Sequence, residues 1–172
     1  ISDNQTINET PLWIALSDSI KQFDLPVSLL EDLLRAFRQD VTKTRYADLT
    51  QLLEYCQYSA NPVGRLVLHL HGSPTDRQLY QSDCICTALQ LINFFQDIEQ
   101  DFLEKDRIYI PQDHMQNAGI NESQLIASDP RQLASVLRPL FEYTRNLMRS
   151  GLPLGMSLSG RIGWEIRAMT LG

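Results

Sequence analysis

The sequence is poor in cysteine, and the longest apolar runs are short. Among its 172 residues only Cys56, Cys84 and Cys86 are cysteines. They are odd in number and lack the nearby Cys or His partners that a zinc site requires. We therefore expect reduced, buried thiols in a cytoplasmic protein. The apolar runs are far shorter than the roughly 20 residues of a membrane span, which argues against an integral membrane protein.

Basic residues are too few for a protein that binds nucleic acid. The chain has 15 Lys and Arg against 21 Asp and Glu, a formal net charge of -6. Binding to a nucleic-acid backbone needs a basic surface instead. The acidic balance does not exclude an anionic substrate, because bound cations can reverse the local field.

The two ends of the sequence do not establish where the native protein is targeted. Neither a signal peptide nor a polybasic tail is visible. The sequence begins at Ile1 without a Met and ends inside an apolar pattern at residues 168–171. It also has no internal repeat. We expect one domain over residues 1–172, truncated at both ends.

The alternation of apolar and polar residues that is typical of β-strands is also missing, whereas apolar residues recur at helical spacing along the chain. We predict an all-α fold with helices over residues 11–22, 27–39, 48–58, 76–104, 130–150 and from about 157 to the C-terminus. Pro62 and Gly64 should break or kink the chain before an apolar segment at 66–70. Pro139 should kink the helix over 130–150 or divide it in two.

The helix predicted over 76–104 has a polar stripe of one charge sign. At about 100° per residue, one line on its surface holds Asp83, Gln90, Asn93, Asp97, Asp101 and Glu104. No Lys or Arg lies between Arg77 and Lys105, although a solvent-facing helix usually mixes both signs. Asp97 and Asp101 are four residues apart and therefore repel each other unless a cation binds between them.

This spacing is compatible with a magnesium site. Mg²⁺ takes one or two carboxylates, keeps several waters and completes its octahedron with phosphate oxygens. Gln90 and Asn93 could hold a ligand or a metal-bound water beside the two carboxylates. The alternative is an amphipathic helix with its polar face in solvent, and the spacing alone leaves both interpretations open.

The residues around the stripe carry a family resemblance. The pattern is Gln, Asn, Asp, Asp, a short loop, Arg, an aromatic residue and Pro, here Gln90, Asn93, Asp97, Asp101, Arg107, Tyr109 and Pro111. It resembles the second aspartate-rich motif of the squalene/phytoene synthases. A second signature of that family, which begins Tyr-Cys and closes Val-Gly, stands upstream at residues 55–64. The first aspartate-rich motif is missing from the sequence, so half of the family's metal site should lie outside it.

Residues 59–65, 93–97 and 163–165 resemble the branch of the family that serves bacterial hopanoid biosynthesis. This resemblance implies a hydroxysqualene- or squalene-forming enzyme that consumes presqualene diphosphate, a C30 substrate. Gln96 stands where many members carry Arg, which removes one diphosphate-binding cation. The alternative within the family is head-to-head condensation of two prenyl diphosphates to phytoene or presqualene diphosphate.

The resemblance also implies a mechanism and roles for single residues. Asp97 and Asp101 would be Mg²⁺ ligands in a metal cluster that binds the substrate diphosphate, with Gln90 and Asn93 beside them as substrate-binding residues. The metals and basic residues would neutralise the leaving group. An apolar, aromatic cavity would then keep water from the carbocation.

Two further residues have a structural alternative beside their implied role. Arg107 would contact the diphosphate, or else pair with Asp106 or Glu104 as a loop cation. Tyr55 would point into the cavity as a catalytic hydroxyl or π-face, or else be a buried, hydrogen-bonded core residue.

We expect Asp97 and Asp101 to lie on one helix and to face a cavity. The fragment alone should lack synthase activity and self-associate, whereas the complete enzyme should be cytoplasmic and contact the membrane peripherally to release an apolar product. A different class remains open, a non-catalytic helical module whose acidic helix docks a basic partner. A head-to-tail prenyl elongation enzyme is disfavoured, because its D-D-x-x-D clusters are missing.

Overall fold

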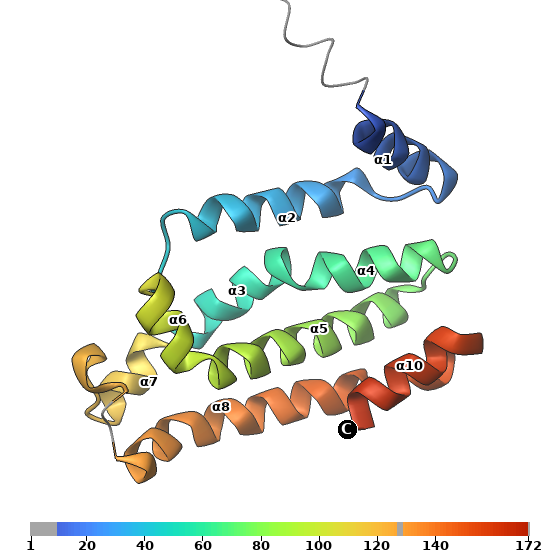
Figure 1. Ribbon diagram of the computed structural model, residues 1–172. Helices are drawn as coiled ribbons and strands as arrows, with labels where there is room; N and C mark the ends of the chain where they lie inside the picture. Colours follow the sequence, from blue (N-terminus) through green and yellow to red (C-terminus); the bar gives the residue numbers. More distant parts are fainter. Residues whose placement is uncertain (1–9, 127–128, 172) are drawn as a thin grey trace, which may run out of the picture.

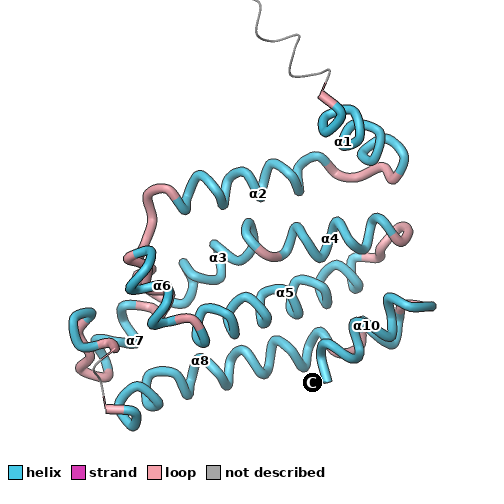
Figure 2. Tube along the Cα trace, viewed as in Figure 1, coloured by secondary structure: helices cyan, strands magenta, loops and turns pink. Residues whose placement is uncertain are grey.

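The computed structural model describes residues 10–126 and 129–171, and within them the chain is helical. The elements are α1 (Pro11–Gln22), α2 (Val27–Asp40), α3 (Leu49–Ser59), α4 (Asn61–Leu70), α5 (Asp76–Gln96), α6 (Ile98–Lys105), α7 (Gln112–Asn117), η2 (Glu122–Gln124), α8 (Pro130–Gly151), α9 (Leu154–Ser157) and α10 (Gly160–Leu171). Short loops join them, and the described part contains no strand (Figure 2). The predicted all-α fold is confirmed.

The long helices lie side by side as successive rows (Figure 1). One row is α2, the next is α3 followed by α4, and α5 lies between that row and α8. The short helices α6 and α7 gather at one end of these rows, and α10 lies near the other end. None of the described helices is both long and apolar enough to cross a membrane.

The core has two parts on either side of the α5 midpoint. The larger part joins α3, α5, α8 and the loop after α6, and it includes Leu52, Leu91 and Ile110, each fully buried. The smaller part contains Leu68, Ile85 and Leu154 and holds α4, α5 and α9 together. The larger part reaches the end of the molecule where the polar motif begins.

Local signals fix where several helices begin. Thr75 forms a capping box with Gln78 at the start of α5. Asp48 accepts a hydrogen bond from the Gln51 backbone N–H at the start of α3, and Asp129 caps α8 just before its first residue, Pro130. These starts agree with the sequence predictions to within about a residue.

Two predicted boundaries were wrong. The helix predicted over 76–104 is divided at Asp97, whose φ of -96° and ψ of 19° leave helical geometry. Gly64 lies inside α4, because the break falls at Ala60 and Pro62 occupies the first turn, where its missing N–H costs nothing. The helix predicted from about residue 157 is α10, which begins at Gly160, and the sequence analysis did not predict α9, the short helix before it.

The helix α8 runs through Pro139 without interruption, so of the two predicted outcomes, a kink or a division, the division does not occur. Proline removes one backbone hydrogen bond, which leaves the carbonyl of Ser135 without its helical partner. Ser135 and Pro139 are both exposed, and water can therefore hydrate that carbonyl. Packing of α8 along α5 supports the helix on both sides of the proline.

Candidate diphosphate and metal site

The polar motif lies at the junction of α5 and α6. Asp97 ends α5 and precedes the first residue of α6. The backbone ladder still crosses the junction, since Asp97 N–H bonds to Asn93 O at 2.9 Å and Asp101 N–H bonds to Asp97 O at 2.8 Å. The two carboxylates are therefore about one turn apart, with Asp97 between α5 and α6 and Asp101 on α6, and not on one helix as predicted.

The two carboxylates have different surroundings. Asp97 is exposed, and its side chain makes no hydrogen bond or ion pair with any described residue. It lines a shallow depression of about 370 Å³ with Gln96, Glu99, Gln100, Leu103 and Glu104. Asp101 is only 7% exposed and is not among the residues lining this depression. The prediction that both face one cavity was wrong.

A lysine explains the difference at Asp101. Lys105 lies one turn further along α6, and its Nζ donates to Asp101 Oδ1 at 2.8 Å. This hydrogen bond raises the pKa of Lys105. The charge that compensates Asp101 in this structure is therefore a neighbouring ammonium group, at the position where the stripe ends.

Another cation compensates the first acid of the stripe. Arg65 on α4 donates to both carboxylate oxygens of Asp83 on α5, at 2.9 and 2.5 Å. This bidentate pair raises the pKa of Arg65. The stripe carries one charge sign along the sequence. In the folded protein, however, Arg65 from α4 neutralises Asp83, which lies at the end of the stripe remote from Asp97.

Gln90 and Asn93 lie on the turns of α5 that precede Asp97. Asn93 is exposed and Gln90 is half-buried. Neither side chain forms a hydrogen bond with a described residue, so both amides are available to a ligand. Together with Asp97 they form the open part of the site.

The donor atoms fit magnesium in chemistry but are too few to enclose it. Asp97 and Asp101 supply hard carboxylate oxygens, and Mg²⁺ commonly keeps several waters beside one or two carboxylates. Within residues 10–126 and 129–171, no group of three or more His, Cys, Asp or Glu side chains could hold a metal ion. The arrangement can therefore supply part of a magnesium site.

Tyr55 is a buried, hydrogen-bonded residue, which agrees with its structural alternative. It is 4% exposed, and its hydroxyl donates to Asp40 Oδ1 at 2.7 Å. Its ring packs against Tyr46, Phe94 and Tyr109, with ring centroids 5.5 to 6.2 Å away. Burial, and then the bond to Asp40, raise the pKa of Tyr55 above its ordinary range, so the phenol is protonated at neutral pH.

Arg107 pairs with neither Asp106 nor Glu104, so its structural alternative was wrong. Its Nη2 donates to the backbone carbonyl of Asp40 at 2.7 Å, and its Nη1 approaches the Tyr109 hydroxyl at 3.4 Å. Burial lowers the pKa of Arg107, but nearby Tyr109 and Asp40 raise it more, and the net shift is upward. The guanidinium is therefore charged.

Backbone pairing places Arg107 at this end of the molecule. Its own N–H bonds to Asp101 O at 3.0 Å, just after Asp106 turns the chain with a φ of 49°. The next N–H, from Ile108, bonds to Thr44 O at 3.0 Å in the isolated parallel bridge of residues 45 and 108. The loop before α3 thus holds the loop after α6.

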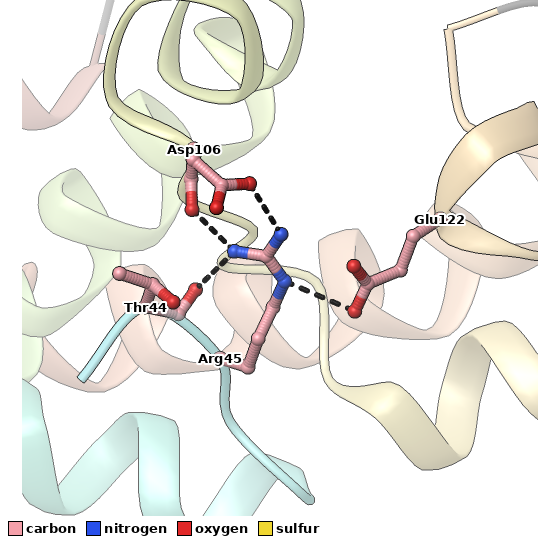
Figure 3. A network of polar contacts seen from close by, with 4 residues as sticks. All are labelled: Thr44, Arg45, Asp106 and Glu122. Atoms are coloured by element: carbon pink, nitrogen blue, oxygen red, sulfur yellow. Dashed lines mark hydrogen bonds and ion pairs between the residues drawn. The ribbon is translucent and has the colours of Figure 1, made fainter.

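Arg45 fastens the same two loops through its side chain (Figure 3). Its Nη2 donates to Asp106 Oδ1 at 2.7 Å, and its Nε donates to Glu122 Oε1 at 3.0 Å. Its Nη1 donates to the carbonyls of Thr44 and Asp106. One guanidinium therefore joins the segment before α3, the segment after α6 and η2.

Sequence analysis missed Asp40, Arg45 and Tyr46 as parts of this region. Asp40 lies too close to Tyr55 in the sequence to match the family's first aspartate-rich motif. No helical periodicity marks Arg45 or Tyr46, which lie between α2 and α3. Their roles depend on contacts with residues about 60 positions later in the chain.

Comparison with known proteins places these features in a family. The sequence model of squalene/phytoene synthase matches residues 2–171. The hydroxysqualene synthase of Rhodopseudomonas palustris is 36% identical over 159 residues, covering 91% of this chain and 54% of that protein. The hydroxysqualene synthase of Zymomonas mobilis is 47% identical over 95 residues, covering 55% of this chain and 31% of that protein.

A solved structure has the same arrangement of helices. The crystal structure of squalene synthase HpnC from Alicyclobacillus acidocaldarius matches with a TM-score of 0.87 at 32% identity. The match covers 95% of this chain and 62% of the other. These two matches, with the Rhodopseudomonas palustris and Alicyclobacillus acidocaldarius proteins, cover nearly all of this chain. The chain spans about half to three fifths of the length of those relatives.

Proposed function

Because the chain belongs to the squalene/phytoene synthase family, we propose that it forms one wall of the active site of an isoprenoid synthase that ionises a prenyl diphosphate. Its helices have the helical terpenoid synthase fold. The observation that carries the proposal is that the motif aspartates and the charged Arg107 lie at the same end of the molecule, where the Arg107 backbone N–H bonds to Asp101 O at 3.0 Å. Carboxylates and guanidinium groups are the groups that hold diphosphates and their cations.

The substrate that we propose is presqualene diphosphate, with hydroxysqualene as the product. Relatives that are 36% and 47% identical are named hydroxysqualene synthases, which supports this choice. In this reaction the C–O bond to the diphosphate breaks, and the electron pair leaves with the diphosphate. Water then adds to the carbocation and loses a proton, so no reductant is consumed. Formation of squalene would require a hydride instead.

In the proposed site, Asp97 and Asp101 hold Mg²⁺, and Gln90 and Asn93 orient the diphosphate or its bound water. The metal would supply positive charge that stabilises the leaving diphosphate. Asp97 is open to solvent and has no competing partner in the described chain. Asp101 is held by Lys105, so it is already fixed in place and shares its charge with an ammonium group.

Arg107 and Tyr55 act on opposite parts of the substrate in this proposal. The charged guanidinium of Arg107 neutralises the diphosphate, because charge-assisted hydrogen bonds to phosphate oxygens are among the strong ones. Tyr55 offers a π-face near the carbocation while its hydroxyl stays bonded to Asp40, and its ring lies beside the stacked pair Phe94–Tyr109, whose centroids are 3.7 Å apart. This aromatic cluster also keeps water from the cation.

The test uses the full-length native protein with Mg²⁺ and presqualene diphosphate. Hydroxysqualene, identified by mass spectrometry, is the expected product with and without NADPH. Product that depends on NADPH would instead indicate a squalene-forming enzyme. Condensation of two shorter prenyl diphosphates would support the phytoene synthase type of reaction. A protein that neither turns over nor binds these diphosphates would support the non-catalytic docking module.

A further inference from the structure

Asp40 contacts the two proposed active-site residues from two directions. It is the last residue of α2. Its carboxylate accepts the Tyr55 hydroxyl at 2.7 Å, and its backbone carbonyl accepts Arg107 Nη2 at 2.7 Å. Tyr55 comes from α3 and Arg107 from the loop after α6. One residue at a helix end thus connects three segments that are distant in the sequence.

Each contact satisfies a group that would otherwise lack a partner. The last carbonyls of an α-helix have no hydrogen-bond partner within the helix, and a cation near them is favoured by the helix dipole. Arg107 therefore caps the C-terminal end of α2. The hydroxyl of a buried tyrosine also needs an acceptor, and the Asp40 carboxylate is a charged acceptor at short distance.

We propose that Asp40 is a positioning residue for the ionisation of the prenyl diphosphate, because it fixes the hydroxyl and ring of Tyr55 relative to the Arg107 guanidinium. This inference rests on the function proposed above. Asp40 does not itself touch the substrate. Its carboxylate acts through Tyr55, whose ring lies within the aromatic cluster of Tyr46, Phe94 and Tyr109.

The geometry separates the two contacts experimentally. Arg107 binds the backbone carbonyl of residue 40, which every substitution at this position retains. Replacing the side chain therefore removes the link to Tyr55 and leaves the link to Arg107 in place. Asp40→Asn keeps an oxygen that can accept the Tyr55 hydroxyl, whereas Asp40→Ala removes the acceptor.

The experiment measures kcat and KM for Asp40→Asn, Asp40→Ala, Tyr55→Phe and the double variant Asp40→Ala/Tyr55→Phe in the full-length protein. Asp40→Ala should lower kcat by about tenfold or more, which is the scale of one hydrogen bond to a charged group, with little change in KM. Asp40→Asn should retain most of kcat. The double variant should be no slower than Tyr55→Phe alone, because the hydroxyl that Asp40 orients is already missing. Glu31→Ala, an exposed acid on the same helix, is the control and should match the wild type.

The proposal would be overturned if the factor by which kcat falls in the double variant equals the product of the factors in the two single variants, because Asp40 would then act independently of Tyr55. If Asp40→Ala does not fold, as judged by circular dichroism, the same cycle is measured with Asp40→Leu. An equal loss of kcat from Asp40→Leu in the wild-type protein and in the Tyr55→Phe protein would again overturn the proposal. Inactive wild-type protein would refute the proposed function, and with it the role of Asp40. Active wild-type protein with independent losses would refute the role of Asp40 alone.

Discussion

At the scale of single residues, two aspartates of one motif differ in accessibility and in partner. Asp97 is exposed at the junction of α5 and α6, and Asp101 is buried against Lys105. An incoming cation can therefore reach Asp97 directly, whereas it must compete with an ammonium group at Asp101. Substitutions at Asp97 thus report on the proposed chemistry with the least effect on folding.

We predict that Asp97→Asn in the full-length protein abolishes Mg²⁺-dependent turnover and leaves the fold intact. The change removes one charge and almost no volume from an exposed side chain, so the free energy of unfolding should change by less than about 0.5 kcal/mol. A charged carboxylate oxygen that Mg²⁺ prefers is lost. Turnover and a thermal melt measure the two effects. Glu99→Gln, in the same depression, is the control, and a wild-type rate for Asp97→Asn would contradict the proposed role.

At the scale of elements, close approach of helices and the clamping of loops determine where the motif lies. Glycine at position 64 allows α4 to approach α5, because a Cβ at this position would overlap Cys86 Sγ and Ser82 Oγ. Arg45 joins the segment before α3 to the loop after α6 and to η2 (Figure 3). Both contacts act at a distance from Asp97 and yet fix the elements that carry the site.

We predict that Gly64→Ala lowers the free energy of unfolding by about 1–3 kcal/mol, the usual cost of overpacking. The added methyl group must displace the side chains of Cys86 and Ser82 or separate α4 from α5. Denaturant unfolding measures the loss. Combining the change with Cys86→Ala should recover part of it, because the sulfur atom is then absent. Gly72→Ala is not a suitable control, since Gly72 has a φ of 148°.

For the loop clamp, we predict that Arg45→Ala lowers the free energy of unfolding by about 1–2 kcal/mol, because partly buried, charge-assisted hydrogen bonds are lost while exposure screens part of their strength. The matched control is Arg161→Ala, which removes an exposed pair with Glu165 on α10 and should change stability by about 0.5 kcal/mol or less. Urea unfolding compares the two. Equal effects would show that the Arg45 network does not stabilise the loops.

At the scale of the whole molecule, the described chain offers one side of the proposed metal site and several uncovered apolar side chains. Its acidic groups are too dispersed to hold a metal ion by themselves, within the residues that the structure describes. Trp164, Met169 and Leu171 on α10 are exposed, as is Leu12 on α1. Association with another surface would cover such exposed apolar side chains.

We predict that the 172-residue chain alone lacks synthase activity with Mg²⁺ and presqualene diphosphate, and that it self-associates. Without further carboxylates to bind metal ions, the departing diphosphate is stabilised several kcal/mol less in the transition state. This corresponds to a rate that is lower by about a thousandfold or more. Mass spectrometry of the products and light scattering after size-exclusion chromatography test both statements, with the full-length protein as the control. Product from the isolated chain would show that its own residues complete the site.

The sequence by itself determined the helical class, most helix starts and the residues of the motif. These depend on signals within a few positions, such as the cap at Thr75, the proline at Pro130 and apolar spacing. The order and spacing of the motif were likewise sufficient to indicate the family that the comparisons showed.

Only the tertiary structure decided which charges and hydroxyls meet. Arg65 neutralises Asp83 from 18 positions away, and Arg107 reaches the Asp40 carbonyl from 67 positions away. Such pairs depend on how α4 packs on α5 and how the loop after α6 returns to α2, which no local pattern encodes. Helical periodicity is a property of neighbouring residues, whereas the partner of a buried polar group is set by the packing of the whole chain.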